Sequence, residues 1–198
     1  KTRYVGADPD GQLDPKAVSR AASQETAVIV VNSPNNPTGA VYPESTIRAL
    51  VGTAEDVDAL LVVDEVYDHF DYSGRFASAL DVESEQRIVT NAFSKTMAVT
   101  GLRVGYVVIE DEELRERART RHMLTNVTGS RPAQYAVAHA LESTPPNYYA
   151  ESRRHVADRI DRLTDALDDV GADYTDPDGG FYVLARFPEF GGDFEAVY

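Results

Sequence analysis

The sequence predicts an α/β fold in which helices flank a largely parallel β-sheet. The first observation is a set of short apolar runs rich in β-branched residues, at Ala27–Val31, Leu60–Val63, Arg87–Thr90 and Val104–Ile109. The first two runs, Ala27–Val31 and Leu60–Val63, are typical of buried strands. The second observation is that segments with helical patterning separate these runs. An alternation of strands and helices indicates a parallel sheet.

The first 24 residues are polar and rich in turn formers. Tyr4–Val5 could form a short strand. Asp14-Pro15 is typical of a helix start, with a capping side chain followed by proline in the first turn, so we expect a short helix to about Ala22. The apolar run Ala27–Val31 then predicts the first strand of the sheet, buried on both faces.

Turn-forming residues follow this strand in the run Asn32–Gly39 (NSPNNPTG), which favours neither helix nor strand. Pro43-Glu44 begins the next predicted helix. The second strand, Leu60–Val63, leads directly into Asp64–Tyr67 (DEVY). Open α/β sheets bind ligands at the carboxyl ends of their strands, so the segments after these two strands are candidates for a binding site.

The last part of the chain is predicted to be mainly helical. We expect three helices and a final glycine turn with a strand, over Glu110–Leu124, Arg131–Leu141, Asn147–Val170 and Gly179–Leu184. We therefore divide the chain after residue 125. The first part would hold most of the sheet, and the second part would begin a smaller domain.

The composition is that of a globular protein, with 42% hydrophobic and 9% aromatic residues. The net charge of −14, from 33 acidic and 19 basic side chains, argues against a nucleic acid or an anionic membrane as a partner. Only three lysines stand against sixteen arginines. The acid excess and the shortage of lysine suggest a halophilic protein from a salt-rich cytoplasm, where counter-ions screen the repulsion between carboxylates.

Several classes of site are excluded by what the sequence lacks. It contains no cysteine, and therefore no disulfide, thiol nucleophile or thiolate metal site. His122, His139 and His155 lack the spacing of metal ligands, so no metal site is expected. No apolar run is long enough to span a bilayer and no signal peptide opens the chain, so we expect a soluble, cytoplasmic protein.

Lys95 is the most conspicuous candidate for chemistry. It follows the third predicted strand and, unlike Lys1 and Lys16, lies among small and apolar residues. A partly buried lysine amine with a shifted pKa suits Schiff-base chemistry with a carbonyl compound. The ordinary alternative is a solvated surface lysine.

Three motifs follow three successive strands: Asn35–Gly39 (NNPTG), Asp64–Tyr67 (DEVY), and Ser94-Lys95 with Gly101–Tyr106 (GLRVGY). In order and spacing they resemble the large domain of the fold-type I pyridoxal phosphate (PLP) enzymes, within the class I and II aminotransferases. Three motifs in register are a specific signal, whereas one alone would be weak. By this resemblance, residues 1–125 belong to the PLP-binding large domain. Residues 126–198 would be connecting helices and part of a C-terminal small domain.

The resemblance implies a role for each motif residue. Lys95 would form the Schiff base with PLP and move the proton between the substrate α-carbon and the cofactor. Asp64 would pair with the pyridine nitrogen and keep the ring protonated, so that PLP acts as an electron sink. Without the motif, an aspartate at the end of a strand more often caps a helix or forms a turn.

By the same resemblance, Tyr67 and Asn36 would hydrogen-bond the phenolic oxygen of the ring and lower the pKa of the neighbouring Schiff base. Ser94 and Arg103 would bind the phosphate through charge-assisted hydrogen bonds. The ordinary alternatives are a packed aromatic for Tyr67, a turn residue for Asn36 and a solvated surface group for Arg103.

The activity implied by the resemblance is transamination, in which an amino acid gives its α-amino group to PLP and a 2-oxo acid takes it back. Aspartate or an aromatic amino acid is the expected donor, and 2-oxoglutarate the expected acceptor. The same motifs also occur in lyases and decarboxylases, and in non-catalytic PLP-fold sensor domains of transcription regulators. These alternatives stay open.

The chain also departs from the family. Members usually have about twice this length and form homodimers. Nothing here matches their N-terminal part, which supplies a phosphate-binding turn, an aromatic stacked on PLP and a tyrosine for the partner subunit. The C-terminal arginine that binds the substrate α-carboxylate has no match either. We therefore expect an internal fragment of an aminotransferase, which alone binds PLP weakly and has little or no activity.

Overall fold

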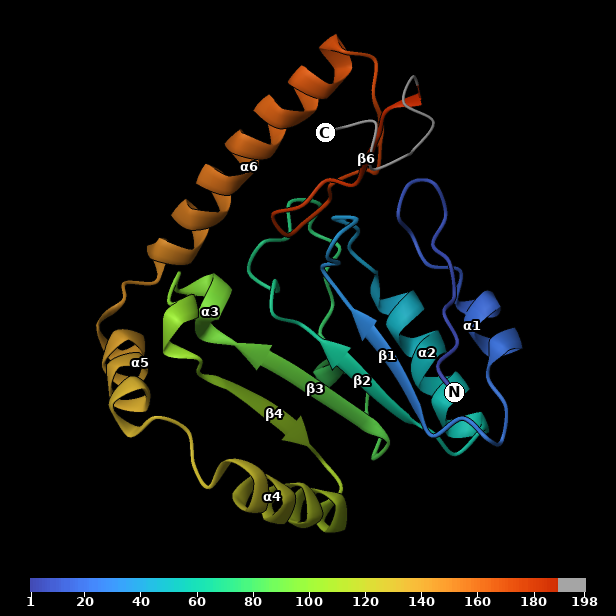
Figure 1. Cartoon of the computed structure of the whole chain (residues 1–198), viewed down its shortest axis with the longest axis vertical. Coiled ribbons are helices and arrows are strands. Elements are labelled where there is room, and N and C mark those ends of the chain that lie inside the picture. The colour runs from blue at the N-terminus through green and yellow to red at the C-terminus, as the bar shows by residue number, and fades with distance from the viewer. Residues whose placement is uncertain (189–198) are drawn as a thin grey trace.

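The computed structural model describes residues 1–188 of the 198-residue chain. Its centre is a four-stranded sheet with the spatial order β1-β2-β3-β4 (Figure 1). Strands β1 (Val28–Asn32), β2 (Leu60–Asp64) and β3 (Arg87–Ala92) run parallel, and β4 (Gly105–Ile109) runs antiparallel to β3. The predicted α/β class with a largely parallel sheet is confirmed.

Two N-terminal helices cover one face of this sheet. The first, α1 (Pro15–Ala21), begins as predicted, since the Asp14 carboxylate accepts a hydrogen bond of 2.9 Å from the Lys16 amide. This bond satisfies one of the free N–H groups of the first turn. Helix α1 packs on α2 (Glu44–Asp56), and α2 packs on β2.

The core lies between α2 and the covered face of the sheet. From α2, Ile47, Leu50 and Ala54 are fully buried. The strands contribute buried aliphatic side chains, namely Val31, Leu61, Val63 and Val89. Burying a side chain of this size contributes roughly 1.5–3 kcal/mol. This layer therefore holds the strands, and the loops at their ends, in fixed positions.

Two expectations for the N-terminal part are wrong. Tyr4–Val5 forms no strand, and Tyr4 is 91% exposed, because no neighbouring strand pairs with its backbone groups. Strand β1 is buried on one face only, since Val31 is 7% exposed but Val30 is 71% exposed. Helices α1 and α2 cover only one face of the sheet. The side chains of β1 that point to the other face are therefore exposed to solvent.

The remaining elements lead away from the sheet and back to it (Figure 1). In order they are η1 (Ala79–Asp81), α3 (Phe93–Thr96), η2 (Thr100–Leu102), α4 (Glu112–Asn126), α5 (Arg131–Ser143), α6 (Asn147–Asp169), β5 (Asp173–Tyr174) and β6 (Ala185–Arg186). Strands β5 and β6 form a separate antiparallel pair. No helix among residues 1–188 combines the length and the apolar character needed to cross a membrane.

The predicted final strand begins later than expected. Residues 179–184 are irregular, and only Ala185–Arg186 pairs with β5. The reason is that the two glycines donate hydrogen bonds to neighbouring loops. Gly179 donates to the Gly39 carbonyl and Gly180 to the Phe70 carbonyl, both at 2.8 Å. Figure 1 shows this segment returning from α6 toward the tips of β1 and β2.

Candidate active site

The carboxyl edge of the sheet brings three loops together. The strand register places Asn32, Asp64 and Thr90 in one row near the ends of β1, β2 and β3. This row and the loops beyond it carry all six residues expected from the sequence, namely Asn36, Asp64, Tyr67, Ser94, Lys95 and Arg103. Four of them, Asn36, Asp64, Tyr67 and Lys95, form one group, and the other two lie around the β3–β4 connection.

Tyr67 is the centre of this group, and it is only 3% exposed. Burial raises the pKa of its hydroxyl above the ordinary value of 10, and hydrogen bonding with Tyr182 raises it further. Hydrogen bonding with Asn36 lowers this pKa, and the negative charge of Asp64 raises it. The net shift is upward, so the phenol keeps its proton at neutral pH and can donate it to a hydrogen bond.

Lys95 lies in the short helix α3, directly after β3. Its Nζ atom is 5.5 Å from the centroid of the Tyr67 ring, a distance at which a cation and an aromatic face attract each other. The side chain is half-buried. No hydrogen bond or ion pair joins the amine to another residue within 1–188. In the described part of the chain, Lys95 is thus neither fully solvated nor engaged in an ion pair.

Asp64 is the last residue of β2 and is half-buried. Its Oδ1 atom accepts a hydrogen bond of 3.2 Å from the Val66 amide, so it also forms the turn that aspartates at strand ends favour. The second carboxylate oxygen, Oδ2, has no hydrogen-bond partner in the described part of the chain. A half-buried carboxylate with one free oxygen can accept a hydrogen bond from a cationic N–H group.

Asn36 is exposed, and its backbone is held by Asn32, a residue that sequence reasoning did not single out. The Oδ1 atom of Asn32 accepts a hydrogen bond of 2.7 Å from the Asn36 amide, and its Nδ2 atom donates one of 2.8 Å to the Asp64 carbonyl. The available signal was a polar residue at the last position of an apolar strand. It was overlooked because Asn32–Gly39 consists of turn formers throughout.

The loop that carries Asn36 is closed by its own residues. Asn35 Oδ1 accepts hydrogen bonds from the Thr38 amide at 3.2 Å and the Thr38 hydroxyl at 2.8 Å. Gly39 has a φ of 74°, and a Cβ atom there would lie 2.7 Å from the Tyr182 carbonyl oxygen. Glycine is therefore required at this position by both the backbone conformation and the close approach of Tyr182.

Ser94 and Arg103 are tied together by Thr100. Ser94 is buried, and its carbonyl oxygen accepts a hydrogen bond of 2.9 Å from the Thr100 hydroxyl. Arg103 is exposed with a φ of 54°, and its Nη1 atom donates to the Thr100 carbonyl at 2.9 Å. A guanidinium has five N–H donors, so the remaining ones can reach an anion.

A glycine turn from near the C-terminus packs on the other side of Tyr67. Phe181 and Tyr182 contact the Tyr67 ring edge-on, with ring centroids 5.2 Å and 5.9 Å away. Phe181 also contacts Phe70, at 4.5 Å between centroids. Tyr67 is therefore a packed aromatic residue, as the ordinary alternative expected, and its hydroxyl makes polar contacts as well. Tyr182, which acts on the Tyr67 hydroxyl, was not among the expected site residues.

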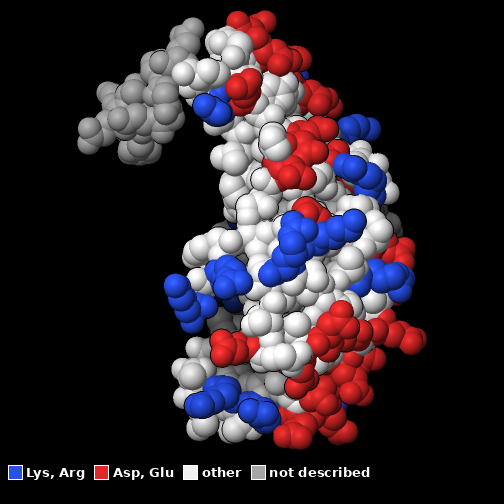
Figure 2. Space-filling model, turned by 90° about the vertical axis from the view of Figure 1, so that its right-hand side faces the viewer, with Lys and Arg blue, Asp and Glu red and all other residues white. Residues whose placement is uncertain are grey.

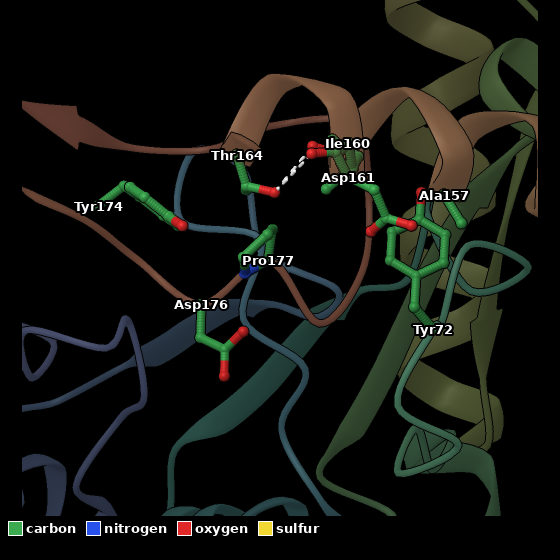
Figure 3. A pocket seen from close by; sticks show the side chains of 8 residues that line it. All are labelled: Tyr72, Ala157, Ile160, Asp161, Thr164, Tyr174, Asp176 and Pro177. Atoms are coloured by element: carbon green, nitrogen blue, oxygen red, sulfur yellow. Dashed lines mark hydrogen bonds between the residues drawn. The ribbon is translucent and has the colours of Figure 1, made fainter. Parts of the chain in front are cut away.

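Figure 3 shows a cavity of about 230 Å³. It is lined by Tyr72, by residues of α6 and by the segment around β5: Ala157, Ile160, Asp161, Thr164, Tyr174, Asp176 and Pro177. None of the six expected residues lines it. Burial, and then the negative charge of Asp161, raise the pKa of Tyr72. The Tyr72 hydroxyl donates to the Gly180 carbonyl at 2.5 Å, which connects the cavity wall to the glycine turn.

Within residues 1–188, no group of three or more His, Cys, Asp or Glu side chains is arranged to hold a metal ion. His69, which follows Tyr67 closely, instead stacks on Tyr149 with 4.6 Å between ring centroids. This contact ties the loop after β2 to the first turn of α6.

Comparison with known proteins agrees with the resemblance in the motifs. The sequence profile of the family described as "Aminotransferase class I and II" matches residues 1–190. A probable aspartate/prephenate aminotransferase of Thermus aquaticus is 37% identical over 173 residues, which cover 86% of this chain and 45% of that protein. A probable aspartate aminotransferase of Methanocaldococcus jannaschii is 32% identical, with 100% and 53% covered. The chain thus spans about half the length of these relatives.

Solved structures extend the similarity to three dimensions. The aspartate aminotransferase of Thermus thermophilus with maleate has a TM-score of 0.87 and 34% identity, covering 93% of this chain and 49% of that chain. The aromatic aminotransferase of Pyrococcus horikoshii has a TM-score of 0.83 and 29% identity, covering 92% and 50%. Both fold and sequence are thus shared over more than nine tenths of this chain.

Proposed function

The chain belongs to the family of class I and II aminotransferases, and on that premise we propose that the protein is a PLP-dependent transaminase. It would move the α-amino group of an amino acid to a 2-oxo acid. One observation carries the proposal, namely the position of Lys95. Lys95 is half-buried and has no ion-pair partner among residues 1–188, and its Nζ atom lies 5.5 Å from the centroid of the Tyr67 ring. Asn36 and Asp64 are presented at the same edge of the sheet.

For the substrates, we propose aspartate or an aromatic amino acid as the donor and 2-oxoglutarate as the acceptor. The names of the relatives support this choice, because they specify aspartate, prephenate or aromatic amino acids. The relatives named in the comparisons are all aminotransferases, which favours transamination over the lyase, decarboxylase and sensor alternatives.

The residues present fit PLP, which we propose as the cofactor. When bound, PLP supplies an aldehyde that reacts with amines and a protonated ring that withdraws electrons from the substrate. Asp64 offers its free carboxylate oxygen to the ring N–H group, while Tyr67 offers a protonated hydroxyl and Asn36 an amide to the ring oxygen. Ser94 and Arg103 offer hydroxyl and guanidinium donors to the phosphate.

Each side chain then has a task in the proposed reaction. Lys95 would hold PLP through its Nζ atom and would move a proton at the α-carbon of the substrate. The Asp64 carboxylate would favour the protonated form of the ring nitrogen. Tyr67, whose raised pKa keeps its hydroxyl protonated, donates a hydrogen bond. Arg103 anchors the phosphate by its charge and by its planar set of donors.

The organisation of the protein belongs to the same proposal. Residues 1–125 form part of the PLP-binding domain, and residues 126–198 form connecting helices and part of a small domain. A homodimer fits the family resemblance, in which a tyrosine of the partner subunit completes the site.

We also propose a cytoplasmic location, because free amino acids and 2-oxo acids are made and used there. The net charge of −14 supports a salt-rich cytoplasm. Figure 2 shows Asp and Glu side chains gathered at the upper end and at the lower right of one face, with Lys and Arg side chains across its middle and at the lower left.

The proposal is tested by turnover of the complete polypeptide that the gene encodes, with PLP in high salt. Glutamate formation from 2-oxoglutarate is followed with aspartate or phenylalanine as the donor. Lys95→Ala should reduce the rate by at least about a hundredfold, the lower range for loss of a general acid–base group. Lys16→Ala, at an exposed lysine of α1, should leave the rate unchanged. Full activity of Lys95→Ala, or no activity of the wild type with either donor, would overturn the proposal.

A further inference from the structure

We propose that Asn32 is a positioning residue, whose side-chain amide sets the place of Asn36 relative to Asp64 and thereby tunes the binding of the cofactor. The inference rests on the proposed function, since Asn36 and Asp64 are two of the proposed cofactor ligands. Asn32 itself need not touch the cofactor, because it acts through the backbone of these two residues.

The geometry of the Asn32 amide supports this role. Asn32 and Asp64 are direct partners in the parallel register of β1 and β2. Oδ1 of Asn32 accepts from the Asn36 amide at 2.7 Å, and Nδ2 donates to the Asp64 carbonyl at 2.8 Å. Both distances are those of well-formed hydrogen bonds. One planar group thus joins the two ligand-bearing segments at a nearly constant separation.

The local sequence explains why a side chain is needed here. The β1–β2 ladder continues only as far as the Ser33 amide, which donates to the Asp64 carbonyl at 3.1 Å. Beyond it stand Pro34 and Pro37, which have no backbone N–H group. The Asn35 amide donates to the Ala40 carbonyl, so among the described residues no backbone hydrogen bond beyond Ser33 joins this segment to β2. The Asn32 amide supplies the missing link.

Substitution of Asn32 would therefore reach the site through Asn36. In Asn32→Ala, the Asn36 amide loses its acceptor and the Asp64 carbonyl loses one donor. The loop that carries Asn36 then gains freedom, although its own closure by Asn35 and Thr38 remains. We therefore expect Asn36 to form a weaker hydrogen bond with the ring oxygen of the cofactor, with little change in the fold.

The test uses the PLP-loaded protein and two readouts other than activity. PLP affinity is measured by titration of the visible absorption, and the pH midpoint of that absorption is measured on the loaded protein. Asn32→Ala should weaken PLP binding about fivefold, the change that corresponds to one hydrogen bond of ordinary net strength. The midpoint should rise by about half a pH unit, because the ionised ring oxygen loses a hydrogen-bond donor.

A matched control and a double substitution distinguish a positioning role of Asn32 from a general effect on the stability of the protein. Gln86 Nε2 donates to Asp58 Oδ1 at 2.9 Å and so links the residues just before β2 and β3, at the opposite edge of the sheet. Gln86→Ala should leave the affinity and the midpoint unchanged. In an Asn36→Ala background, Asn32→Ala should shift the midpoint no further, because both changes act through the same residue.

The outcomes distinguish this inference from the proposed function. If the wild type shows no Lys95-dependent visible absorption, the proposed function fails and this inference fails with it. If the wild type shows that absorption and folded Asn32→Ala has an unchanged midpoint, only the role of Asn32 is overturned. Full additivity with Asn36→Ala would overturn it as well. If Asn32→Ala does not fold, Asn32→Ser is measured by the same criteria.

Discussion

At the scale of single residues, the candidate site consists of side chains that hold one another. The ring of Tyr67 packs against Phe181 and Tyr182, while its hydroxyl interacts with Asn36 and Tyr182. Burial is the largest cause of its raised pKa. A change in the packing of Tyr67 therefore also changes the strength of its hydroxyl as an acid.

Tyr67→Phe keeps the packed ring and removes only the hydroxyl. In the PLP-loaded protein, we expect the pH midpoint of the visible absorption to rise by about one unit, because the ionised ring oxygen loses a hydrogen bond. Spectrophotometric titration measures this midpoint. Tyr4→Phe, at a residue that is 91% exposed, is the control and should have no effect. An unchanged midpoint in Tyr67→Phe would mean that its hydroxyl does not reach the cofactor.

At the scale of elements, a turn from far along the chain completes the site. Gly179 and Gly180 donate to the carbonyls of Gly39 and Phe70, which lie in the loops after β1 and β2. The turn thus joins the two loops that carry Asn36 and Tyr67. Gly179 allows the close approach to Phe70, and Gly180 adopts a φ of 72°, which favours glycine.

Gly179→Ala should disrupt this junction. A Cβ atom there would lie 2.6 Å from the Phe70 carbonyl oxygen and 2.7 Å from Val41 Cγ2. We expect the free energy of unfolding, measured by urea denaturation, to fall by about 1–3 kcal/mol, as is typical of overpacking. Gly52→Ala in α2 is the matched control, because no atom lies within 4 Å of its Cβ position. It should raise stability by up to about 1 kcal/mol, and equal losses in both variants would contradict the account.

Glu65 links η1 to the end of β2. Its carboxylate accepts hydrogen bonds from the Ala79 amide and the Ser78 hydroxyl, both at 2.7 Å. Burial raises its pKa above the ordinary value of 4.5, and these two hydrogen bonds offset that effect only in part. The folded protein therefore keeps a proton on Glu65 at pH values where the unfolded chain has lost it.

This difference predicts a pH dependence of stability. The contribution from Glu65 is fully present below pH 4.5 and is lost as the pH rises through the raised pKa of the folded state. Compared with Glu65→Gln, the wild type should therefore lose stability over that interval and then level off. Urea denaturation at a series of pH values measures the difference. Exposed Glu25→Gln controls for the removal of one charge, and a difference that is constant with pH would refute the prediction.

At the scale of the whole molecule, strands β1 to β3 have one covered and one open face, whereas β4 is exposed on both faces. Val28, Val30 and Val107 lie on the open face and are exposed. Their strands are nevertheless as apolar as those of a sheet that is covered on both faces. An open apolar surface of this kind is typical of a face that binds a further layer of protein.

A pair of isosteric substitutions tests this asymmetry in the 198-residue chain. Val30→Thr should change the free energy of unfolding by no more than about 0.5 kcal/mol, because Val30 is 71% exposed. Val31→Thr should cost about 1–3 kcal/mol, because it buries a hydroxyl in the core. Both values come from urea denaturation. Similar losses in the two variants would mean that the second face is also covered in solution.

Much of this architecture could be predicted from the sequence, because local patterns carry it. Apolar β-branched runs predicted the sheet, and the motif order predicted that Asp64, Tyr67 and Lys95 would meet at its edge. The open face of β1 could not be predicted, since exposure depends on what packs there. The contact of Tyr182 with Tyr67 and the bonds of Asn32 were likewise missed, because they join segments distant in sequence or hidden among turn formers. The roles of the site residues stay predictions.

The central claim, that Lys95 binds PLP, can be tested directly by chemical trapping. The complete polypeptide is incubated with PLP and reduced with borohydride, and the modified peptides are mapped by mass spectrometry. Residues 1–198 contain three lysines, Lys1, Lys16 and Lys95, and each of them gives a distinct peptide. The account predicts that the label concentrates on Lys95 although Lys1 and Lys16 are the more exposed. Labelling spread equally over the three lysines, or favouring Lys16, would contradict it.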